Sequence, residues 1–127
     1  MRAGDTFKFS PAASSDKHLW VVISDPESYP DDLVVIVSLT SHDLWKDPAC
    51  VLNLGDHPFI RHETSVYYTK ARFVSRGRLD HLVEVGDVIP NTPMEPEVLA
   101  RIRRGAGDSD FIKEGFHKAL VAQALVD

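Results

Sequence analysis

The sequence has a single cysteine, Cys50, among its 127 residues. One thiol cannot form a disulfide within the chain, which excludes a disulfide framework and makes a reducing compartment the expected location. No apolar run approaches the roughly 18 residues that a membrane span requires, and residues 1–10 lack the apolar core of a signal peptide. We therefore expect a cytoplasmic protein with no membrane association.

Motifs for cofactors and metals are absent as well. Gly105-Ala106-Gly107 lacks the preceding strand and the following Lys-Ser/Thr of a phosphate-binding loop. The chain has no Cys-x-x-Cys pair, and His62-Glu63 is not followed by a histidine at the spacing of the helical zinc motif. His57 and His62 have a spacing that suits metal ligation neither from a helix nor from a strand. We expect no metal and no cofactor.

The chain has more acidic than basic residues, and its charges are unevenly distributed along the sequence. Its formal net charge of −5 disfavours a globally basic, histone-like binder. Residues 1–60 carry nine acidic groups against four basic ones, residues 61–78 carry five basic groups against one acidic group, and residues 79–94 are purely acidic. The basic stretch is either a solvated face with ordinary ion pairs or a local phosphate-binding surface, and charge alone does not distinguish these.

Hydropathy and turn residues predict a mainly β fold. We expect an early strand, buried apolar strands and a run of later strands, over residues 6–9, 19–23, 33–39, 50–54, 65–68 and 70–74. Residues 75–79 are expected to close this β region, and residues 86–90 to form a short extended piece. Short strands with turns every eight to twelve residues are typical of a small barrel or sandwich.

The pattern changes near residue 93. Pro96-Glu97 fits the first turn of a helix, and Gly105 and Gly107 are expected to end that helix. Asp108 and its neighbours can cap a second helix, whose mostly apolar face runs from Ile112 to Gln123. We predict one domain, with a barrel over residues 1–92 and a helical segment packed on it over residues 93–127.

Polar side chains gather where the predicted strands meet loops. Metal-free cleavage of RNA needs a base for the ribose 2′-hydroxyl, donors or cations for the phosphate, and an acid for the leaving oxygen. Residues of these types lie at the ends of the strands and in the connections, and Lys70 and Arg72 alternate on one face of the strand over 70–74. The full set is Lys17, His18, Thr40, Ser41, His57, Arg61, His62, Ser65, Lys70 and Arg72. Each also has a structural interpretation: a turn for Thr40-Ser41, a rim position for His18, loop hydrogen bonds for His57 and His62, an ion pair for Arg72.

Three segments follow one another in a characteristic order. Gly4-Asp5-Thr6 precedes the strand Leu19–Ser24, the segment Leu33–Ser41 ends in Thr-Ser, and Lys70-Ala71-Arg72 is followed by Arg78-Leu79. This order resembles that of the MazF/PemK (CcdB-like) toxins, with their Gly-Asp opening, their Pro-x-Thr-Ser signature and their Gln-x-Arg-Thr element. The resemblance covers roughly residues 4–80.

The resemblance implies an SH3-like barrel of the CcdB/MazF type, usually a homodimer, that acts as a metal-independent endoribonuclease and is held in check by an antitoxin. Thr40 matches the family's catalytic threonine, and Arg72 matches its later arginine. Lys17-His18 stands where the family has an arginine before the second strand, and residues 57–62 have no counterpart. This indicates a divergent branch in which histidines have taken over acid–base work.

We therefore expect the toxin of a prokaryotic toxin–antitoxin system that cleaves single-stranded RNA. The expected catalytic residues are His18, Thr40, His62 and Arg72, and the expected substrate-binding residues are Lys17, Ser41, His57, Arg61, Ser65 and Lys70. The alternatives are a non-catalytic barrel that binds a protein or nucleic acid, as gyrase-binding CcdB-like barrels do, and a ligand-binding barrel with no nucleic-acid role. Convergence of Arg61, His62 and Arg72 with Thr40 and His18 in one cleft would favour the nuclease, and histidines on separate faces would favour binding.

Overall fold

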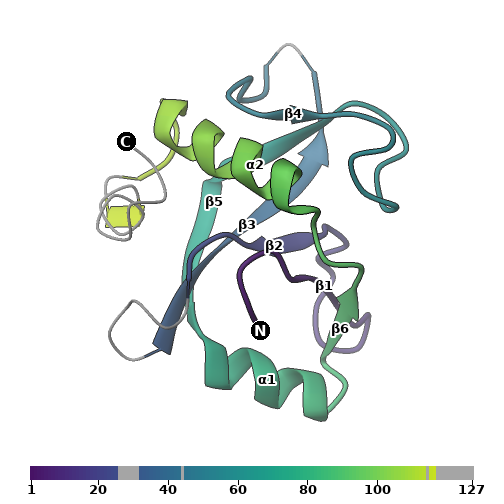
Figure 1. Cartoon of the computed structure of the whole chain (residues 1–127). Coiled ribbons are helices and arrows are strands. Elements are labelled where there is room, and N and C mark those ends of the chain that lie inside the picture. The colour runs from purple at the N-terminus through teal and green to yellow at the C-terminus, as the bar shows by residue number, and fades with distance from the viewer. Residues whose placement is uncertain (26–31, 44, 114, 117–127) are drawn as a thin grey trace.

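A computed structural model describes residues 1–25, 32–43, 45–113 and 115–116 (Figure 1). In these residues six strands form one sheet: β1 Thr6–Phe9, β2 Trp20–Val22, β3 Leu33–Ser41, β4 Val51–Leu52, β5 Thr64–Ser75 and β6 Val88–Asn91. Helix α1 covers Arg76–Glu84, and helix α2 covers Pro96–Asp108. The segments expected as strands over 65–68 and 70–74 are thus one long strand, β5.

The strand order is β4-β5-β3-β2-β1-β6, and every pairing is antiparallel. The long strands β3 and β5 form the centre, with Thr40 opposite Ser65 and Ile36 opposite Arg72 across an irregularity in the register. β4, at one edge, is only 2 residues long and does not pair with β6 at the other edge. The expected mainly β fold with helices is confirmed, but the strand pairing does not close a barrel.

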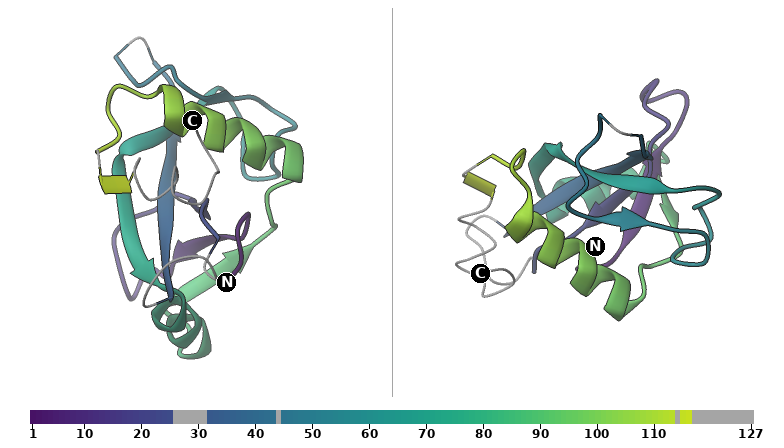
Figure 2. Two further views of the ribbon diagram at one scale, coloured as in Figure 1. Left: turned by 60° about the vertical axis from the view of Figure 1, so that its left-hand side comes forward. Right: turned by 90° about the horizontal axis from the view of Figure 1, so that it is seen from above.

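Alternate residues of β3 belong to two different cores, as the two-residue period of a strand requires. Val35, Val37 and Leu39 pack in the core that also contains apolar residues of α2. Val34 and Ile36 point to the opposite face and pack with Leu79 of α1. Figures 1 and 2 show α2 running across the sheet, with α1 at the end of β5. The face that carries α1 also carries Lys70 and Arg72, which line a pocket together with Arg78 of the helix.

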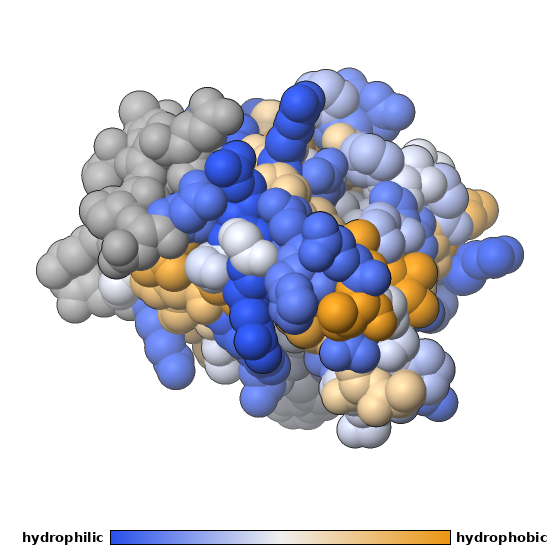
Figure 3. Space-filling view, turned by 90° about the horizontal axis from the view of Figure 1, so that it is seen from below, coloured by the Kyte–Doolittle hydropathy of each residue, from blue (hydrophilic) through white to orange (hydrophobic). Residues whose placement is uncertain are grey.

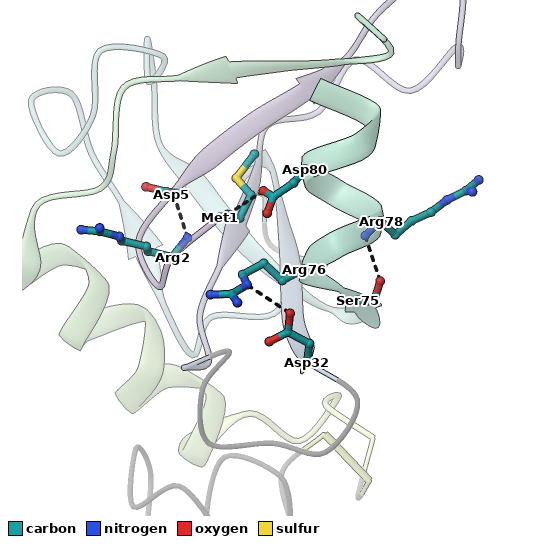
Figure 4. A network of polar contacts seen from close by, with 8 residues as sticks. All are labelled: Met1, Arg2, Asp5, Asp32, Ser75, Arg76, Arg78 and Asp80. Atoms are coloured by element: carbon teal, nitrogen blue, oxygen red, sulfur yellow. Dashed lines mark hydrogen bonds and ion pairs between the residues drawn. The ribbon is translucent and has the colours of Figure 1, made fainter. Parts of the chain in front are cut away.

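Helix α1 begins where the sequence predicted a closing turn. The Ser75 hydroxyl accepts a hydrogen bond from the Arg78 backbone N–H at 2.9 Å and so caps the helix. The Arg76 guanidinium pairs with Asp32 at 3.2 Å, and the Met1 ammonium pairs with Asp80 at 2.7 Å (Figure 4). Ser75 is therefore the N-cap of a helix. The sequence analysis expected residues 75–79 only to close the β region and did not predict this helix. Viewed from below, the molecule is mainly hydrophilic with apolar patches (Figure 3).

Helix α2 also differs from the prediction, because it continues through Gly105 and Gly107 to Asp108. Gly105 is buried, and a Cβ placed there would lie 2.7 Å from the Cys50 Cβ and would also meet the Tyr68 hydroxyl. Gly105 thus permits close packing of helix against sheet and does not end the helix. Cys50 is buried in this core. The second predicted helix, over 112–123, lies largely outside the described residues.

Candidate active site

A pocket of about 430 Å³ lies at the end of β3. Its wall comes from the loop before β2, from the last residues of β3 and from the loop between β4 and β5. Six of the ten predicted site residues line it: Lys17, His18, Thr40, Ser41, Arg61 and His62. We call it the imidazole pocket, because it brings together two histidines that are far apart in the sequence.

His18 is oriented by a carboxylate that the sequence analysis did not select. Its Nδ1 lies 3.0 Å from Asp16 Oδ1, and its backbone N–H donates to the same oxygen at 2.8 Å. The other Asp16 oxygen accepts from Trp20 Nε1 at 3.3 Å. A carboxylate on Nδ1 leaves Nε2 as the nitrogen available to a substrate. The side chain of His18 is 53% exposed, so Nε2 is reachable from the pocket.

The Asp16 carboxylate is kept in its charged form. Burial raises the pKa of Asp16, but the backbone and side-chain hydrogen bonds from His18, and the bond from Trp20, outweigh burial and leave the pKa below its usual value. Asp16 is therefore ionised at neutral pH and can stabilise a protonated His18. The Asp-x-His spacing before a buried strand was the sequence signal for this pair.

The second histidine of the pocket is held by a serine. His62 Nε2 lies 2.8 Å from the Ser41 Oγ. The two residues are exposed at the pocket's rim, one at the end of β3 and one in the loop before β5. The pair fixes the His62 imidazole beside Thr40-Ser41, the segment that matched the toxin signature.

Thr40 is almost buried, and its hydroxyl is contacted by a cation. Lys46 Nζ donates to Thr40 Oγ1 at 2.9 Å and lies 5.9 Å from the centre of the Tyr67 ring. The ammonium group therefore polarises the hydroxyl that the family resemblance assigns to catalysis. The sequence did not predict a role for Lys46, because it lies in a loop. It reaches Thr40 only because the loop after β3 folds back over the strand.

A larger pocket, of about 650 Å³, adjoins the first at His18, which lines both. Lys70 and Arg72 of β5 and Arg78 of α1 contribute three cations to its wall, so we call it the cation pocket. The Arg72 guanidinium lies over the Trp20 ring at 4.8 Å, an arrangement typical of cation–π contact. Among the described residues Arg72 forms no ion pair, and its charge stays available to an anion.

Two predicted site residues lie in the protein interior instead of in these two pockets. His57 is 4% exposed; its Nε2 lies 2.6 Å from the Thr92 carbonyl oxygen, and its Nδ1 accepts from the Phe59 N–H. Ser65 is also buried, and its Oγ lies 2.5 Å from His42 Nδ1. The bond to Thr92 joins residues 35 positions apart in the sequence, so it supports the fold.

We expect His57→Phe to lower the free energy of unfolding by about 2 kcal/mol, since it leaves the part-buried Phe59 N–H and Thr92 carbonyl oxygen without their partner. Urea unfolding at neutral pH measures this. The matched control is His81→Phe, at an exposed position of α1, where a change below about 0.5 kcal/mol is expected. Equal effects of the two substitutions would show that the His57 bonds contribute nothing to stability.

In the parts of the chain that the structure describes, no three or more His, Cys, Asp or Glu side chains gather as metal ligands would. Within the same residues, neither α1 nor α2 has the length and apolar character needed to cross a bilayer. Comparison with protein-family models and with curated protein sequences found no match for the chain.

Proposed function

We propose that the chain is a cytoplasmic toxin of the MazF/PemK type, a metal-independent endoribonuclease that cleaves single-stranded RNA. The observation that carries the proposal is the imidazole pocket, where His18 and His62 lie with Lys17 and Arg61 around one space next to Thr40. The proposal includes the family's SH3-like barrel topology, a homodimer and control by an antitoxin. The antiparallel sheet and the positions of Thr40 and Arg72 on neighbouring central strands support it.

His18 is the general base in this mechanism. Its Nε2 removes the proton of the ribose 2′-hydroxyl while Asp16 holds Nδ1 and stabilises the imidazolium that forms. The 2′-oxygen then attacks the adjacent phosphorus, and the bond from phosphorus to the 5′-oxygen breaks. His62, as imidazolium, gives its proton to the departing 5′-oxygen. The products are a 2′,3′-cyclic phosphate and a free 5′-hydroxyl.

The charge that develops on the phosphate is met by donors on two sides. Lys17 and Arg61 line the imidazole pocket, and Thr40 contributes a hydroxyl that is bound to Lys46. The cation pocket adjoins at His18 and can hold the next phosphate of the strand on Lys70 and Arg72. A local group of cations of this kind is compatible with a net charge of −5.

The test is incubation of the folded protein with a long single-stranded RNA in EDTA, followed by analysis of the ends. We expect cleavage that leaves 2′,3′-cyclic phosphate, a loss of about 100- to 10,000-fold in rate for His62→Ala, and a smaller loss for Arg72→Ala. His81→Ala and Arg104→Ala, at exposed positions on the two helices, are matched controls that should leave the rate unchanged. Intact RNA would contradict the proposal and favour the non-catalytic binding barrel.

A further inference from the structure

A third pocket, of about 180 Å³, lies on the other side of Thr40. Its wall includes Trp45, Lys46, Tyr67 and Phe111, and it shares Thr40 with the imidazole pocket. Three aromatic rings, the Lys46 ammonium and the Asp47 carboxylate thus line a space much smaller than either of the other two. We call it the aromatic pocket.

Two of the aromatic side chains in this pocket are unusually exposed to solvent. Trp45 is 93% exposed and Phe111 is 53% exposed, whereas the other tryptophan, Trp20, is 1% exposed. Large aromatic side chains are normally buried for most of their surface, and their exposure beside a pocket is typical of a binding site. Neither ring belongs to the two apolar cores formed by the residues that the structure describes.

The backbone around these rings is fixed by hydrogen bonds. The Trp45 N–H donates to Asp43 Oδ1 at 2.8 Å, and the Phe111 N–H donates to Ser109 Oγ at 3.0 Å. The Ser109 hydroxyl in turn donates to Asp47 Oδ2 at 2.5 Å, which ties the segment after α2 to the loop after β3. These bonds fix the backbone on the two walls of the pocket, which are distant in the sequence.

We propose that the aromatic pocket binds an unpaired nucleobase of the RNA next to the phosphate that is cleaved. The inference rests on the proposed function and extends it from the phosphate to a base. Stacking on aromatic side chains is how proteins hold single-stranded nucleic acid, and the Lys46 ammonium adds attraction for the strand. Because Thr40 lines both pockets, a base bound here belongs to a nucleotide beside the scissile bond.

The pocket explains a selection for single strands. A base inside a duplex is stacked between its neighbours and must be extruded before it can reach Trp45 and Phe111, which costs free energy. We therefore expect single-stranded RNA to bind more tightly than the same sequence in a duplex. Stacking accepts any base, so the pocket confers this selection without requiring one sequence.

The experiment is a fluorescence titration of the wild-type chain with an uncleavable 2′-O-methyl hexanucleotide. Trp45 is the exposed tryptophan, so stacking of a base is expected to quench and shift its emission, while Trp45→Phe should abolish the change. By anisotropy with a labelled hexanucleotide, Trp45→Ala and Phe111→Ala should each weaken binding by about 5- to 150-fold. Leu54→Ala, at a residue 75% exposed and outside the pocket's lining, is the control and should leave binding unchanged.

The outcomes separate this inference from the proposed function. Quenching by the hexanucleotide without cleavage of natural RNA would support the base site and contradict the nuclease. A second outcome would overturn the base site alone. In it, the wild-type chain cleaves RNA without quenching of Trp45, and Trp45→Ala and Phe111→Ala are as active as Leu54→Ala. An abasic oligomer of equal charge that quenches Trp45 as strongly as the hexanucleotide would overturn it too, because the signal would then come from phosphates.

Discussion

Replacement of His18 by alanine is expected to slow RNA cleavage by about 100- to 10,000-fold, the contribution typical of general acid–base catalysis. His18 is the imidazole whose Nδ1 is held by a carboxylate and whose side chain is half exposed to the imidazole pocket. The rate constant for cleavage of a short RNA at saturating protein measures the loss. Affinity for an uncleavable 2′-O-methyl oligonucleotide should change little, since the cations that bind the phosphates remain.

Rescue by free imidazole separates a catalytic role from a structural one. His18→Ala leaves a space in an exposed wall, and added imidazole should enter it and restore part of the rate in proportion to its concentration. A fold defect would not respond in this way. His81→Ala provides the matched control, because His81 is exposed on α1 and should neither lose activity nor respond to imidazole.

Asp16→Asn tests the positioning of the imidazole. The asparagine keeps the shape of the side chain but removes the charge that stabilises a protonated His18, so an intermediate loss of rate is expected. Free imidazole should not rescue this variant, since its His18 is present. Cleavage by His18→Ala within about twofold of the wild-type rate would contradict the assignment of His18 as base, whatever the result for Asp16.

The sequence predicted the parts of the site that depend on local pattern. His18, Thr40 and Ser41 adjoin apolar, β-branched strands, and polar residues at such positions are visible in the hydropathy pattern. Their convergence with Arg61 and His62 depends on the pairing of β3 with β5, which a pattern of single strands does not contain. The separation of Arg72 into an adjoining pocket follows from the same pairing.

The residues that the sequence did not predict owe their position to long-range contacts. Lys46 reaches Thr40 because the loop after β3 folds back over the strand, and no periodicity marks that path. Helix α1 was missed because Ser75-Arg76-Gly77-Arg78 has the composition of a turn, although Ser75 caps the helix. Gly105 was interpreted as a helix end because glycine is common there. Its actual role depends on residues more than thirty positions earlier in the chain.

Gly105→Ala is expected to lower the free energy of unfolding by about 2–4 kcal/mol, although alanine is the better helix former. The added Cβ would lie 2.7 Å from the Cys50 Cβ and would collide with the Tyr68 hydroxyl. Tyr68 is fully buried, and its hydroxyl donates to the Ile102 carbonyl oxygen at 2.6 Å. Displacement of α2 or of the tyrosine would leave this buried hydroxyl without its acceptor.

The matched control for this substitution is Gly77→Ala in helix α1. A Cβ at Gly77 meets no atom within 4 Å, so the same change should stabilise the protein by up to about 1 kcal/mol through helix propensity alone. Urea unfolding of both variants gives opposite signs if close packing is the reason for Gly105. A loss of stability in Gly77→Ala equal to that in Gly105→Ala would contradict this reason.

A double-mutant cycle with Tyr68→Phe identifies the atom responsible. Removing the hydroxyl should itself destabilise the protein by about 1 kcal/mol through the lost hydrogen bond to Ile102. It also removes one of the atoms that an alanine at Gly105 would meet, so alanine should cost less in the Tyr68→Phe background than in the wild type. The part of the cost that persists is due to Cys50 and to the Ala49 carbonyl oxygen at 3.1 Å, which stay in place in both backgrounds. Strict additivity of the two substitutions would mean that the Tyr68 hydroxyl is not what requires glycine at Gly105.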